Sequence, residues 1–305
     1  MLPWSDSSGR LKITTRWSTR HPGSQLVVFS AAYQSDDGAK VRTAVVDPVR
    51  DIHLAATYIL LRQQRPLSAG LVFGLIAFKP HLGLLIGIAM LLKGQWRFVG
   101  GSAITVSSLV GICFLTGPDL CMDYFQQCIG SGDYTNSGGY ALEEAQSLHA
   151  VCHLAFDSFS PKLAVSIAAI LGLGVIVLLQ RILRGALETE SQLFGLQFAS
   201  LVVVTVLISP HFYQYDLTIL LLPLMIVWSI LSGAWNDGSN IPLTEPNRRW
   251  LLGMTLALFF GATAFAGIAA ATHIQPCTLI LLGLLVTVWH TRRRCEETTG
   301  YTAFG

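Results

Sequence analysis

The chain has 305 residues, of which 52% are hydrophobic and only 12% are charged. Soluble domains carry about 25% charged residues, so this composition excludes an ordinary soluble protein and indicates a chain that folds in lipid. The net charge of +2 is small, and the Lys and Arg residues form short clusters between apolar runs. We therefore expect membrane lipid, and no nucleic acid, among the partners of this protein.

Residues 1–51 differ in composition from the rest of the chain. Arginines such as Arg10 and Arg42 stand among Ser, Asp and Gly, and no apolar run is long enough for a signal peptide. The apolar stretch 52–61 is also too short for a span, which takes about twenty residues. Two interpretations stay open: a disordered cytoplasmic tail, or a truncated or mis-framed start that replaced one or more native spans.

Eight apolar runs follow, and they predict an all-α fold, a polytopic transmembrane helical bundle over residues 52–291. The last six are long enough to cross a bilayer. The first two are short and flank Lys79-Pro80-His81, which predicts a hairpin or broken helix pair over 66–92. Residues 292–305 are predicted to form a cytoplasmic tail. The runs are 66–78, 82–92, 98–116, 163–180, 193–209, 216–232, 250–272 and 274–290.

Basic residues predict the orientation of these spans. The positive-inside rule places the side richer in Lys and Arg in the cytoplasm. The opposite side keeps only Lys79 and Lys162, together with a long loop at 117–161 and the polar segment 209–216. The polar clusters therefore converge on the outer face, where we expect the site. The basic residues of the other side are Arg62, Arg65, Lys93, Arg97, Arg181, Arg184, Arg248, Arg249, Arg292, Arg293 and Arg294.

The outer loop 117–161 is long enough to be functional. Within it, residues 140–156 carry apolar side chains at helical spacing, which predicts an amphipathic helix at the membrane surface that could wall one side of a site. Gln146 and Ser147 lie on this helix as candidate substrate-binding residues. The six cysteines lack zinc-site spacing, so we expect no metal. A disulfide among Cys121, Cys128 and Cys152 stays open.

Lys79 and His81 are the candidate ligands at the predicted hairpin tip. An ionisable group inside an apolar run marks a site, a pathway or a partner, so we interpret Lys79 as an ammonium that neutralises a donor phosphate. The alternative interpretation is that Lys79 only extends its ammonium to the outer interface of the membrane. His81 is either a substrate ligand or a hydrogen-bonded packing residue.

The segment 209–216 holds a second group of candidates. His211 could bind a phosphate or a sugar hydroxyl, and Tyr215 is a further substrate-binding candidate beside it. Asp216 opens the apolar run 216–232, so it is either an N-terminal residue favoured by the helix dipole or a catalytic base. Phe212 and Tyr213 are typical of an interfacial aromatic belt.

The pattern resembles glycosyltransferase family 87, whose members have the multi-span GT-C fold. The resemblance rests on the run from Arg65 through Lys79-Pro80-His81 to Leu85, on Gln146-Ser147, and on Ser209 to Asp216. It implies a transferase that moves mannose or a related hexose from a polyprenyl-phosphate sugar donor to a lipid or glycan acceptor. It also implies a multi-pass protein of the bacterial plasma (inner) membrane that uses no cofactor.

The resemblance also assigns roles to particular residues. The resemblance implies that Lys79 and His211 bind the phosphate and the substrate. The family's catalytic aspartate lies in the first outer loop, and nothing in this chain matches it, so Asp216 is our alternative base. A secondary transporter and a non-catalytic membrane protein stay open as other functions. A transporter would be expected to show matching halves, and no second interrupted segment pairs with Lys79-Pro80-His81.

Overall fold

The computed structural model describes residues 11–17, 27–33, 48–119, 121–123, 126, 142–185, 187–210, 212, 214–233 and 243–299. The chain divides into two units, residues 1–48 and 49–305. In the first unit, strand β1 (Leu11–Trp17) pairs antiparallel with β2 (Val27–Tyr33), so that Leu11 lies opposite Tyr33. The described residues of segment 1–51 form this strand pair and the start of helix α1; they do not decide between the two interpretations of the segment that the sequence left open. The all-α class therefore holds for the second unit alone.

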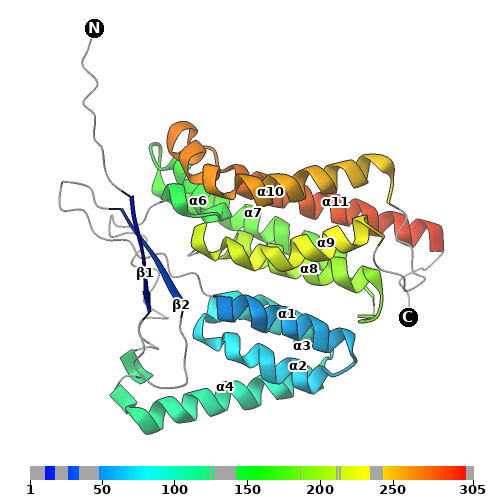
Figure 1. The fold of residues 1–305 in the computed structure, drawn as a ribbon. Helices are drawn as coiled ribbons and strands as arrows, with labels where there is room; N and C mark the ends of the chain where they lie inside the picture. Colours follow the sequence, from blue (N-terminus) through cyan, green and yellow to red (C-terminus); the bar gives the residue numbers. More distant parts are fainter. Residues whose placement is uncertain are drawn as a thin grey trace. The chain divides into compact units, whose positions relative to one another are not determined.

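All elements described in the second unit are helical (Figure 1). Proline stands in the first turn of several of them, where its missing N–H costs no hydrogen bond. The helices are α1 (Pro48–Arg62), α2 (Pro66–Phe73), η1 (Gly74–Phe78), α3 (Pro80–Leu92), α4 (Trp96–Thr116), η3 (Leu142–Glu144), α6 (Leu148–Phe156), α7 (Pro161–Ile182), α8 (Gln192–Ile208), η4 (Gln214–Leu220), α9 (Leu221–Leu231), α10 (Glu245–Thr272) and α11 (Pro276–Thr299). Helix α11 continues past residue 291, where the sequence predicted the tail to begin.

The predicted broken helix pair is present at residues 66–92. Helices α2 and η1 run up to Lys79, and α3 begins at Pro80. Lys79 is extended, at φ −128° and ψ 74°, because the ring of the following proline disfavours helical backbone there. Helix α3 has 13 residues and is therefore about 20 Å long, less than the roughly 30 Å of a hydrocarbon core.

Glycines let this helix pair pack closely against α4. A Cβ on Gly70 would overlap the carbonyl oxygen of Phe98, and one on Gly74 would come within 2.6 Å of the Thr105 Cβ. The Thr105 hydroxyl donates to the Leu71 carbonyl at 2.8 Å. Small residues at four-residue spacing are a common means of packing helices in membranes. The close contact between α2–η1 and α4 therefore holds in place the helical segment that ends at Lys79.

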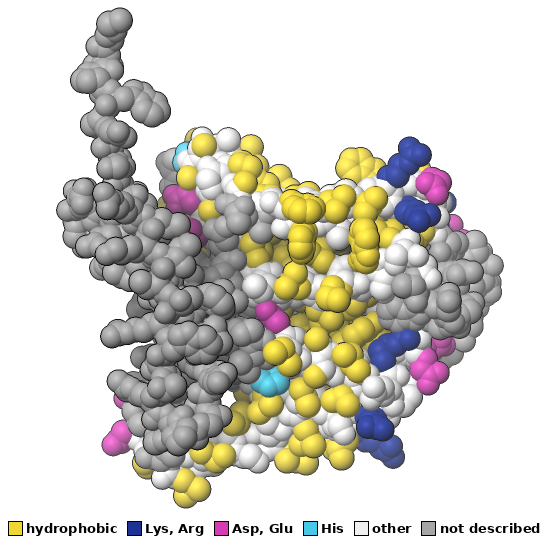
Figure 2. Space-filling model, viewed as in Figure 1, with side chains coloured by type: hydrophobic (Ala, Val, Ile, Leu, Met, Phe, Trp, Pro, Cys, Tyr) yellow, Lys and Arg dark blue, Asp and Glu magenta, His cyan; other side chains and the backbone are white. Residues whose placement is uncertain are grey.

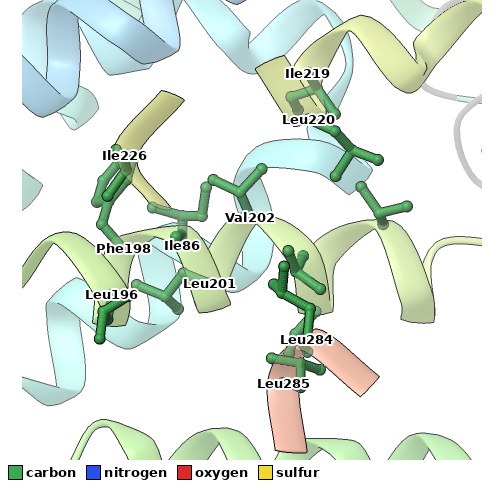
Figure 3. Packing of buried hydrophobic residues seen from close by; sticks show 14 of the residues in the cluster. Ile86, Leu196, Phe198, Leu201, Val202, Ile219, Leu220, Ile226, Leu284 and Leu285 are labelled. Carbon is green, nitrogen blue, oxygen red and sulfur yellow. The ribbon is translucent and has the colours of Figure 1, made fainter. Parts of the chain in front are cut away.

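Helix α8 is the centre of the core. Every residue from Phe194 to Leu207 is buried, as expected for a helix that is apolar all round. Figure 3 shows Phe198, Leu201 and Val202 of α8 among side chains of α3, α9 and α11. Tyr58 of α1 also stacks on Phe194, with ring centroids 5.8 Å apart. In Figure 1, α8 and α9 run through the middle of this unit. The segment 209–216 therefore emerges from the best-packed helix.

Fewer helices could cross a membrane than the six that the sequence predicted. By length and composition two described helices qualify, Trp96–Leu115 and Pro161–Ile182. A third is the bent pair Glu245–Gly261 and Ala264–Thr272, if it counts as one span. The run 193–209 forms a helix of only 17 residues, the run 216–232 begins as a 3₁₀ helix, and α11 carries three arginines in its second half. These features account for the difference.

The basic residues gather at one end of the helices, here called the basic end. Arg292 of α11 donates to the carbonyls of Ile182 and Arg184 at the end of α7, and Lys93 donates to Gly185 at 2.8 Å. These cations lie where helix dipoles and unsatisfied carbonyls favour them. On the face drawn in Figure 2, Lys and Arg side chains lie at this end beside a broad apolar surface. Arg292 and Lys93, which the sequence assigned to the same side, therefore lie together at this end.

Candidate functional site

An ion pair between Lys79 and Asp216 lies at the end of the helices opposite the basic end. The Lys79 Nζ is 2.9 Å from Asp216 Oδ1, and the two residues are 137 positions apart in the chain. The Asp216 side chain is 3% exposed, whereas Lys79 is 25% exposed. Two candidates that the sequence placed in separate clusters thus meet in space.

Local backbone structure explains how both side chains reach this place. Lys79 occupies the break before α3, where the extended backbone interrupts two apolar helices. Asp216 lies in the first turn of η4, which continues directly into α9. A carboxylate near a helix N-terminus gains from the dipole, and a buried carboxylate also needs a cation or hydrogen-bond donors. Asp216 therefore has both a dipole and an ammonium to stabilise its charge.

The loop residues 142–147 lie beside the segment that carries Asp216. The backbone N–H of Gln146 donates to the Phe212 carbonyl at 2.9 Å. The Ser147 hydroxyl accepts a hydrogen bond from the Ala150 amide at 3.3 Å and caps α6. Gln146 and Ser147 are fully buried. The structure therefore places Gln146 against the segment that leads to Asp216, while Ser147 contributes the cap of α6.

Helix α6 begins later than the sequence predicted, at Leu148 rather than 140. The Ser147 cap explains this boundary, because a capping serine has extended backbone and cannot belong to the helix. Leu148 and Cys152 are buried on α6, as their helical spacing predicted. Cys121 and Cys152 are free thiols, so neither forms the disulfide that was left open, and Cys128 lies outside the described residues.

Gln275 joins the site from the other end of the sequence. Its Nε2 donates to the carbonyls of Leu142 at 3.2 Å and Glu143 at 2.8 Å. Sequence reasoning missed this residue, because it was counted as part of the apolar run 274–290. A polar glutamine directly before Pro276, within an otherwise apolar run, was the available signal.

The other candidates are only partly placed. His81 is exposed in the first turn of α3. His211 lies outside the described residues, and of Tyr215 the structure describes the backbone, which belongs to η4. Among the described residues, no group of three or more His, Cys, Asp or Glu side chains could hold a metal ion.

Residues 51–210, just over half of the chain, match glycosyltransferase family 87. The chain belongs to this family. Family 87 proteins are membrane glycosyltransferases, so the protein has a sugar donor and an acceptor. This assignment favours the transferase over the transporter considered from sequence. The match includes Lys79, Gln146 and Ser147, and it ends before Asp216 and Gln275. Comparisons with curated proteins and with solved structures find no match.

The arrangement sets an ammonium and a carboxylate 2.9 Å apart. An ammonium can neutralise the charge that grows on a departing phosphate, and a carboxylate can accept the proton of an acceptor hydroxyl. In the structure these groups neutralise each other. Substrate chemistry at this place would therefore begin with exchange of the ion pair.

Proposed function

We propose that this family 87 protein transfers a hexose, mannose, from a polyprenyl-phosphate donor to a lipid or glycan acceptor on the outer face of the bacterial plasma membrane. The observation that carries the proposal is the Lys79–Asp216 pair, which sets a cation and a buried carboxylate side by side at one end of the helices.

The distribution of charge supports the outer face. The basic end holds Arg62, Lys93 and Arg292, whose contacts at the ends of α7 and the start of α8 place them together. The positive-inside rule assigns such an end to the cytoplasm, so the Lys79–Asp216 end faces outward. A polyprenyl donor suits this end, because its chain stays in lipid while its phosphate lies near the interface.

The proposed reaction is an inverting displacement at the anomeric carbon. The donor phosphate competes with Asp216 for the Lys79 ammonium, and this exchange frees the carboxylate. Asp216 then accepts the proton of the acceptor hydroxyl as its oxygen attacks, while the bond from the sugar to the phosphate breaks. Lys79 stabilises the negative charge that develops on the departing phosphate.

The remaining candidates take supporting roles in this proposal. His211 and His81 bind the phosphate or a sugar hydroxyl, and Tyr215 contributes to the substrate site from η4. Gln146 and Ser147 act through the loop that they stabilise, since both are buried and Ser147 caps α6. The mechanism uses no nucleotide.

The test is transfer from radiolabelled polyprenyl-phosphate mannose in proteoliposomes containing the purified chain. Lys162 is the matched control for Lys79, because it is an exposed lysine at the start of α7, at the same end of the helices. We expect Lys79→Ala to reduce kcat/KM about 100-fold or more, as the loss of a transition-state donor does, and Lys162→Ala to stay within about twofold. Asp216→Asn should abolish turnover if Asp216 is the base. Wild-type turnover in Lys79→Ala would overturn the proposal.

A further inference from the structure

We infer that Gln275 is a positioning residue of the transfer site, which holds the loop residues 142–147 against the segment that carries Asp216. The inference rests on the proposed function, and it adds a residue outside the part of the chain that matches family 87.

The side chain of Gln275 commits both of its donors to the loop. A primary amide carries two N–H groups. The Nε2 of Gln275 contacts the consecutive carbonyls of Leu142 and Glu143, at 3.2 and 2.8 Å. The residue is fully buried and immediately precedes Pro276, whose fixed φ begins α11. Gln275 thus presents two N–H donors from a buried position next to a proline with restricted backbone.

Hydrogen bonds and two short stretches of chain connect Gln275 to the ion pair. The loop that Gln275 holds continues to Gln146, whose backbone N–H donates to the Phe212 carbonyl at 2.9 Å. Phe212 is fully buried and lies four residues before Asp216, which pairs with Lys79. The position of the loop therefore sets the path of the chain that delivers the carboxylate.

The polar groups at this place are costly to bury, which argues that they serve more than packing. The Oε1 atoms of Gln146 and Gln275 and the Ser209 hydroxyl are buried without a hydrogen-bond partner among the described residues. Apolar side chains at these positions would avoid that cost. The contacts that its amide makes in return are the two N–H bonds to the loop.

The experiment compares three variants in detergent and in proteoliposomes. Gln275→Met keeps the length of the side chain without donors, and Gln275→Glu keeps its shape without the amide N–H groups. Thr278→Val is the matched control, because Thr278 is equally buried one turn further along α11 and its hydroxyl is unpartnered among the described residues. Each variant is measured for hydrogen exchange of peptides covering 142–148, for thermal unfolding, and for kcat and KM toward the polyprenyl-phosphate donor.

We expect both Gln275 variants to raise exchange at the Gln146 amide and to lower kcat about tenfold or more, since displacement by about 1 Å can cost up to 100-fold in rate. Their KM for the donor should stay within about twofold, and Thr278→Val should match the wild type in exchange and kcat. Unchanged exchange in both Gln275 variants would overturn the inference, and so would raised exchange with wild-type kcat. Absence of transfer in the wild type would count against the proposed function, and the exchange result would then decide the inference alone.

Discussion

Removing Lys79 should destabilise the protein more than removing Asp216. Lys79→Met leaves the Asp216 carboxylate, which is 3% exposed, without its ammonium. Removing one partner of a buried ion pair costs about 3–5 kcal/mol. Asp216→Asn keeps the shape of the side chain and leaves an ammonium that is 25% exposed and can extend to water. The loss is then closer to that of one charged hydrogen bond, about 1.5–3 kcal/mol.

The double variant Lys79→Met/Asp216→Asn should be more stable than Lys79→Met, because no buried charge remains. The loss in the double variant should therefore fall short of the sum of the two single losses by more than the Asp216→Asn loss itself, that is by about 1.5–3 kcal/mol or more. Equilibrium unfolding in mixed micelles of a mild detergent and SDS measures all four proteins of this cycle. Additive effects of the two single changes, or a larger loss in Asp216→Asn than in Lys79→Met, would refute the reasoning from burial.

Three further predictions concern stability. Gly101→Ala should cost about 1–3 kcal/mol by overpacking, because its Cβ would come within 2.9 Å of the Leu71 nitrogen. Gly100→Ala is the control, since a Cβ there meets nothing within 4 Å, and it should be neutral or stabilising. Thermal unfolding of both variants measures the difference. Ser147→Ala should cost about 0.5–2 kcal/mol through the lost cap of α6, and a midpoint equal to the wild type would contradict that role. Burial, and then the charge of Arg292, lowers the pKa of Lys93 from 10.5. Between the lowered pKa of the folded protein and 10.5, the unfolded chain therefore binds more protons at Lys93 than the folded protein does, so the free energy of unfolding should rise with pH in this range. Lys93→Met should flatten that rise. A slope equal to that of the wild type would show that Lys93 is not the cause of the rise.

The break at Lys79 was predictable from sequence, whereas its partner was not. Proline after a charged residue interrupts any apolar helix, so Lys79-Pro80 marks the break locally. Pairing with Asp216 depends on the packing of α3 and η4 around α8, a long-range contact that periodicity does not encode.

Other features show why local patterns fall short of the structure. The spacing of Leu148 and Cys152 predicts a helix, but only the Ser147 cap defines where α6 begins. Hydropathy counted six spans, because it does not register the 3₁₀ start of the run 216–232 or the arginines within α11. Gln275 was not recognised in the sequence because it lies within an apolar run. Its contacts with the loop carbonyls of Leu142 and Glu143 exist only in the folded chain.

The most direct test of the proposed function is the choice of donor. Membranes that contain this chain are supplied with radiolabelled polyprenyl-phosphate mannose, and matched membranes with a radiolabelled nucleotide mannose, and label in lipid and glycan products is counted. The proposed chemistry at Lys79 predicts transfer from the prenyl donor and none from the nucleotide donor. No transfer from the prenyl donor, or equal transfer from both, would contradict it.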